Sequence, residues 1–161
     1  MSVATVKTAV KAVIAGADPV SLVHDYERWT VDPAGFQALY VPAGQPDEAA
    51  YVRAWLVKWT ASERQAQTHS DVVELHSFAL RFFFSVKDAA ASENLAAAIV
   101  EQVQQAFHDN PTLNLPGVTT VPALGPNADQ LGPVLERNEY LQFSTVFCHF
   151  FELRLVVQED V

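Results

Sequence analysis

Histidine and cysteine are the side chains in this sequence best suited to catalysis or metal binding. The histidines are His24, His69, His76, His108 and His149. No two of them stand at the helical i, i+4 spacing that lets a pair hold a metal. The single cysteine, Cys148, excludes a cysteine-rich zinc cluster and an internal disulfide. Because it lies in an apolar run, we expect it to be a buried, unreactive thiol.

Two pairs of these side chains stand close enough in the sequence to act together. Glu74 and His76 lie two residues apart, so on a strand they share a face and could hold a metal if further ligands arrived. Such neighbours are more commonly a solvated or cross-strand polar pair. Cys148 and His149 are adjacent, so on a strand they point to opposite faces and form no nucleophile–base dyad.

The sequence fingerprints of nucleotide binding and of serine hydrolases do not occur. The six glycines are scattered, and none builds a G-x-S-x-G elbow, a Walker loop or a dinucleotide motif. A carboxylate pair for glycoside hydrolysis has no local signature, since two distant carboxylates can meet in the fold. We therefore expect no catalytic residue, no cofactor-binding residue and no metal ligand, and we expect the protein not to be an enzyme.

The charge of the chain argues against nucleic-acid binding. The 161 residues carry a formal net charge of −9, and the ten Lys and Arg are spread along the sequence. They form no basic stripe that would hold phosphates, while the acidic excess favours solubility. Lys7 and Lys11 fall within the periodic pattern of the first 17 residues, so we expect no targeting segment. Charges interrupt the longest apolar stretches, so we expect no membrane-spanning helix.

Two main helices and one short helix are predicted from apolar periodicity and capping residues. The first begins after Ser2 and ends at Gly16. The second begins after Asp88 or Ser92 and reaches about His108. Its predicted buried stripe is Leu95, Ile99, Val103, Ala106 and Phe107. A short helix opens at Asp32-Pro33 and ends at Tyr40.

Strands are predicted where apolar and polar residues alternate. Tyr51–Thr60 and Asp71–Val86 form a hairpin with a projecting polar tip, Ala61–Ser70. An edge strand is predicted at Val20–Trp29, and a short strand, Val118–Val121, lies inside the Pro/Gly-rich loop 110–133. The last two predicted strands are Val134–Phe143 and Thr145–Val157, and an exposed tail, Gln158–Val161, follows them. The sequence thus predicts a single α+β domain over residues 1–161, with an antiparallel or mixed sheet and the two main helices packed on one face.

Several segments follow one another in a characteristic order and spacing. They are the N-terminal amphipathic helix, HDYERW at His24–Trp29, LHSFALRFFF at Leu75–Phe84, DAAASE at Asp88–Glu93, FHDNPTLN at Phe107–Asn114 and CHFFELRLVVQE at Cys148–Glu159. Together these segments resemble the tail-terminator (tail-completion) proteins of long-tailed bacteriophages. The likeness runs over nearly the whole chain, and the stretch Val121–Pro133 has no counterpart.

The resemblance implies a structural virion protein that forms a ring, usually of six subunits. Such a ring caps the finished tail tube and joins it to the head–neck connector, and DNA passes through it without specific binding. The expected location is the tail–neck junction of the virion, after assembly in the host cytoplasm. The partners implied are further copies of the chain, the tail tube protein and the connector proteins.

Three regions of the chain are candidate assembly surfaces, since a cyclic ring needs two complementary patches on each subunit. They are the hairpin tip and the loop 110–133, with the region of Trp29 as a third; within the tip, Glu63, Arg64 and Gln67 are expected to bind a neighbour. Two alternatives remain open. One is another neck component, a head-closure or adaptor protein. The other is a small α+β ligand-binding protein or enzyme, which a deep pocket with clustered titratable groups would favour.

Overall fold

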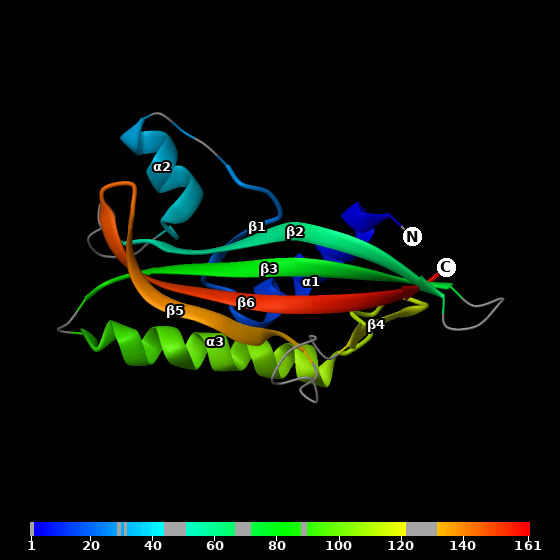
Figure 1. The fold of residues 1–161 in the computed structure, drawn as a ribbon. Helices are drawn as coiled ribbons and strands as arrows, with labels where there is room; N and C mark the ends of the chain where they lie inside the picture. Colours follow the sequence, from blue (N-terminus) through cyan, green and yellow to red (C-terminus); the bar gives the residue numbers. More distant parts are fainter. Residues whose placement is uncertain are drawn as a thin grey trace.

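The computed structural model describes residues 2–28, 30, 32–43, 51–66, 72–87, 90–121 and 132–161. Its helices and its curled, mixed sheet confirm the α+β class (Figure 1). None of the helices in the described ranges is long and apolar enough to cross a membrane. The elements are α1 (Val3–Ala17), β1 (Leu22–His24), α2 (Pro33–Tyr40), β2 (Arg53–Ala66), β3 (Val72–Ser85), α3 (Ser92–Asp109), β4 (Val118–Val121), β5 (Val134–Phe143) and β6 (Val146–Asp160).

The sheet has the strand order β1-β2-β3-β6-β4, and β5 pairs with β6 along the same edge as β4. Strand β1 is parallel to β2, and the remaining pairs are antiparallel. The predicted hairpin is confirmed, but its tip is shorter than expected. Ala61–Ala66 continue β2 and pair with Val72–Ser77 of β3, while Gln67–Ser70 lie outside the described residues. A polar sequence continues as a strand here because the ladder partner, not side-chain burial, fixes the backbone.

One face of the sheet carries the larger apolar core. Val6, Val10 and Ile14 of α1 join residues of α3 and the inward side chains of β2, β3 and β6 in one cluster. Trp55 and Phe82 stack with ring centroids 4.5 Å apart, and both are fully buried. Side chains alternate along a strand. In the run Phe82–Phe84, the first and third rings therefore enter this core, and Phe83 points to the opposite face.

The opposite face carries a smaller core beneath α2. Tyr40 of α2 packs with Phe83, Cys148 and Phe150, and Phe143 lies against this cluster at the β5–β6 turn. Figure 1 shows α2 and α3 on opposite sides of the sheet. Both faces are therefore covered at the end of the sheet where the β5–β6 turn lies.

Helix α3 is rotated by about one residue relative to the predicted stripe. Its buried residues are Ser92, Ala96, Val100, Val103 and Phe107, and Leu95 is 50% exposed. Ser92 lies inside the helix, and the N-cap is Ala91 in the left-handed region (φ 49°). The Oγ of Ser92 lies 2.8 Å from Nε2 of the buried His149 and accepts a hydrogen bond from the Lys87 amide. This anchoring turns the Ser92 face of the helix toward the sheet.

Of the predicted exposed C-terminal tail Gln158–Val161, Asp160 and Val161 are exposed, but β6 extends to Asp160. Gln158 pairs with Leu75 of β3 and with Thr119 of β4, and Glu159 is only 3% exposed. The prediction was wrong for these two residues because β6 lies between two other strands at this level. A charged residue in such a position is buried when the fold supplies a partner.

Candidate functional site

The residues predicted as an assembly surface are only partly described by the structure. Trp29 and Gln67 lie outside the described residues. Glu63 and Arg64 are exposed on β2, but each already has a partner in its own chain: Gln65 Nε2 donates to Glu63 Oε1 at 3.2 Å, and Arg64 Nε donates to Glu74 Oε2 at 3.4 Å. Both contacts are at the surface, where they contribute little to stability.

The second half of β2, Lys58–Ala66, has exposed side chains throughout; we name it the β2 arm. It pairs with β3 along one edge. Strand β1 reaches only Ala54–Leu56, so among the described residues no strand covers the other edge of the arm. Figure 1 shows the arm at the end of the sheet away from α2. An exposed, unpaired edge of this length is a surface that another chain can cover.

A buried polar cluster holds the start of β1 against β2 and so positions the segment that follows. Asp18, only 2% exposed, accepts hydrogen bonds from Ser21 Oγ, from Arg53 Nη2 at 2.6 Å and from Trp55 Nε1 at 3.1 Å. Arg53 Nε also donates to Ser21 Oγ at 2.9 Å. Arg53, the one polar exception in the alternation of its strand, is therefore explained by a charge partner from the end of α1.

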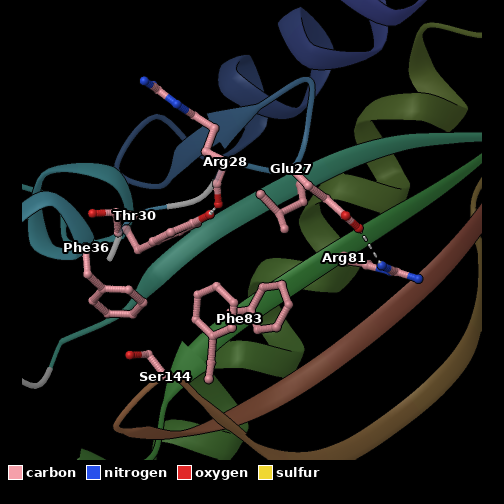
Figure 2. Close-up of a pocket in the computed structure, with 10 residues that line it drawn as sticks. Glu27, Arg28, Thr30, Phe36, Arg81, Phe83 and Ser144 are labelled. Carbon is pink, nitrogen blue, oxygen red and sulfur yellow. Dashed lines mark hydrogen bonds and ion pairs between the residues drawn. The ribbon is translucent and has the colours of Figure 1, made fainter. Parts of the chain in front are cut away.

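A pocket of about 430 Å³ lies on the α2 face of the sheet; we name it the α2 pocket. Its apolar wall comes from α2, from β2 and β3 and from the β5–β6 turn, and its polar side chains come from the segment after β1, from β3 and from the same turn (Figure 2). The apolar side chains are Phe36, Tyr40, Leu56, Phe83 and Phe143, and the polar ones are Glu27, Arg28, Thr30, Arg81 and Ser144. This size and lining suit an apolar group of a ligand or of a partner protein.

The charges at the rim of the α2 pocket are largely paired with one another. Glu27 Oε1 accepts from Arg81 Nη1 at 3.1 Å and from Lys58 Nζ at 3.2 Å, and Arg81 Nε donates to Glu152 Oε2 at 2.5 Å. Tyr40 donates its hydroxyl to the Arg28 carbonyl at 2.7 Å, and burial raises the pKa of that phenol. The pocket thus offers an apolar cavity at whose rim the charges of Glu27 and Arg81 are paired, and Tyr40 stays protonated at neutral pH.

The Cys148 thiol and the imidazoles of His76 and His149 are buried. Burial raises the pKa of Cys148 to about 12, so the thiol is not a nucleophile at neutral pH. His76 Nε2 lies 3.2 Å from Glu159 Oε2, so its partner is on β6 and not the neighbouring Glu74. Burial lowers the pKa of His76 and of His149. Within the described ranges no group of three His, Cys, Asp or Glu side chains could hold a metal ion.

The buried imidazoles predict that stability falls as the solution becomes mildly acidic. His76 and His149 have pKa values below 6.5 when folded and near 6.5 when unfolded, so the unfolded chain binds more protons below that pH. The free energy of unfolding should therefore be highest above pH 7 and fall as the pH decreases from 7 to 5.5.

Urea titrations at pH 7.5, 6.5 and 5.5 measure this dependence. His149→Gln should make it shallower, because that variant removes one of the groups that protonates on unfolding. His108→Gln, on the surface of α3, is the matched control and should keep the slope of the parent protein. A parent protein equally stable at all three pH values would contradict the prediction.

The pocket residues were missed by the sequence interpretation, because they come from four segments far apart in the chain. The only local signal was Phe83, which the strand alternation places on the face opposite to Phe82 and Phe84. No protein-family model matches the chain, and a search of curated proteins gives no match to it.

Proposed function

We propose that this chain is a tail-terminator subunit of a long-tailed bacteriophage. In this proposal six copies form a ring that caps the finished tail tube and joins it to the head–neck connector at the tail–neck junction of the virion. The subunit is assembled in the host cytoplasm, binds no cofactor and catalyses no reaction. The support from the sequence is the set of family-like segments in the expected order over nearly the whole chain.

The β2 arm is the observation that carries the proposal. Its side chains from Lys58 to Ala66 are exposed, and its outer edge has no partner strand in the described ranges. Monomeric proteins usually shorten or cover such edges, because unpaired backbone groups recruit other chains. A subunit that is covered by its neighbours or by a tube after assembly has no need to protect the edge within its own fold.

The net charge of the chain and the placement of its two main helices agree with the same proposal. A net charge of −9 makes a surface that repels DNA, which suits a ring through which DNA passes without being held. We take the two main helices, α1 and α3, as one layer on a single face of the sheet, since both contribute to one core cluster. That layer would leave the arm and the opposite face for contacts with neighbours and with the tube.

The proposal is tested by following assembly with purified protein and tail tubes. Native mass spectrometry and negative-stain microscopy should detect a cyclic oligomer, either free or on the end of a tube, and the capped tube should then bind the connector. A protein that stays monomeric at every concentration and also with tubes would refute the proposal. Binding to the connector but not to tubes would indicate another neck component, a head-closure or adaptor protein.

The role of the β2 arm is tested by Trp59→Ser, because Trp59 is its large aromatic side chain and is 43% exposed. Exposed Trp residues are frequent anchors of protein interfaces. The variant should keep the thermal stability of the monomer but lower ring formation or tube capping about tenfold or more. Val20→Ser, at a position 44% exposed but outside the arm, is the matched control and should assemble like the parent protein.

A further inference from the structure

An exposed aromatic pair stands on the α3 face of the β5–β6 hairpin; we name it the aromatic knob. Tyr140 and Phe147 stack with ring centroids 5.8 Å apart and planes 12° apart, yet they are 51% and 55% exposed. Tyr140 also packs on His149 and donates its hydroxyl to Glu93 Oε2 at 3.2 Å. These contacts hold the pair in place, so burying it in a partner would need little further ordering.

The aromatic knob and the α2 pocket lie at the same end of the sheet but on opposite faces. Tyr140 is the ladder partner of His149, whose side chain points toward α3, whereas Phe143 and Ser144 of the same hairpin line the pocket beneath α2. A protrusion on one face and a cavity on the other cannot meet within one subunit. They are the two different patches that a head-to-tail contact between identical subunits requires.

The charges beside the two patches are complementary. Glu93, next to the knob, bonds the neutral Tyr140 hydroxyl and, among the described residues, no cation. At the mouth of the pocket the Arg28 guanidinium lies 5.7 Å from the centre of the Tyr26 ring rather than against a described carboxylate. Figure 2 shows this side chain directed away from the pocket floor. Within the described part of the chain neither charge has an ion-pair partner, so both can face a partner from outside the subunit.

We propose that the aromatic knob of one copy of this chain inserts into the α2 pocket of the next copy, with Glu93 facing Arg28. This contact rests on the proposed ring and names the surfaces that close it. Aromatic side chains in a pocket, flanked by an Arg–carboxylate pair, are the usual centre of a tight interface. The occupant of the pocket is then a second copy of the chain and not a small molecule.

A charge exchange tests the contact without touching either core. Arg28→Glu and Glu93→Arg should each raise the protein concentration needed for half-maximal ring assembly about tenfold, because each places like charges face to face. The double variant Arg28→Glu/Glu93→Arg should return that concentration to within about threefold of the parent value, since the pair is restored with its signs exchanged. Melting temperatures of the monomers identify any loss of fold.

Disulfide cross-linking gives a second measurement that needs no change of charge. Thr30→Cys at the pocket rim and Gln142→Cys, an exposed position beside the knob whose ladder partner is Phe147, should form a covalent dimer when the two single variants are mixed in oxidant and should form none alone. The double variant should form a ladder of oligomers. The native Cys148 is buried, with its pKa raised to about 12, and stays unreacted.

The outcomes separate this contact from the proposed function. Recovery in the charge exchange together with cross-linking of the mixed variants supports the contact. A parent protein that assembles, with no recovery in the double variant and no cross-link, overturns the contact and leaves the ring standing. A parent protein that never assembles, alone or with tubes, overturns both.

Discussion

Replacing Asp18 by alanine should lower the free energy of unfolding by about 3–5 kcal/mol, the range found when one partner of a buried charge pair is removed. Asp18 is 2% exposed and accepts from Arg53 and Trp55, so the alanine variant leaves both donors without their acceptor. The Arg53 side chain is only 17% exposed, so its charge would remain largely buried without its partner.

The matched control is Asp25→Ala, which removes the same side chain from a surface ion pair. Asp25 lies 3.8 Å from Lys11, and the two side chains are 37% and 40% exposed. Such a pair contributes less than about 1 kcal/mol. Urea unfolding followed by tryptophan fluorescence measures both variants. Equal losses would show that the Asp18 cluster does not hold α1 and β1 to the sheet.

Replacing Phe82 by alanine should also lower the free energy of unfolding by about 3–5 kcal/mol, because a cavity takes the place of the fully buried ring. Phe82 stacks on Trp55 and contacts Phe84 and Phe151, so several core residues lose a neighbour together. The surroundings are strands with fixed registers on both sides, which limits how far they can close the space.

Phe147→Ala is the control for this change, because the same truncation is made at a ring that is 55% exposed. Its effect on the free energy of unfolding should stay within about 0.5 kcal/mol, as for most surface substitutions. The two phenylalanine variants should also differ in assembly. The exposed Phe147 variant should stay folded and assemble poorly, if the knob contact holds. Equal loss of stability in both would contradict the assignment of Phe82 to the core.

The elements of this protein were determined by its sequence where apolar periodicity was strong. Alternation in Leu75–Phe84 predicted a strand with Phe82 and Phe84 on one face, and the structure confirms it. The capped, amphipathic segment after Ser2 forms α1, with Ser2 Oγ accepting from the Thr5 amide. Asp32 and Pro33 begin α2 as predicted. These features follow from local sterics and from the side-chain period, so neighbours in sequence suffice to predict them.

Features that depend on a strand or helix distant in the sequence were not predictable. The sequence predicted Ala61–Ala66 to be part of a polar hairpin tip. In the structure these residues extend β2, because Val72–Ser77 of β3 forms the ladder with them. Glu159 reads as part of a solvated tail but is buried, because β3 and β4 flank β6 at that level. Leu95 reads as core but is exposed, because the Ser92–His149 contact sets the rotation of α3.

The candidate site shows the same division. The sequence by itself determined an acidic chain with one cysteine and several strongly patterned segments, and that was enough to suggest an assembly role and a family resemblance. Only the tertiary structure decided that Phe36, Phe83 and Phe143 line one pocket, and that Tyr140 and Phe147 form a knob on the opposite face. The physical reason is that periodicity assigns a side chain to a face of its own element, whereas a pocket or a knob depends on which elements pack together.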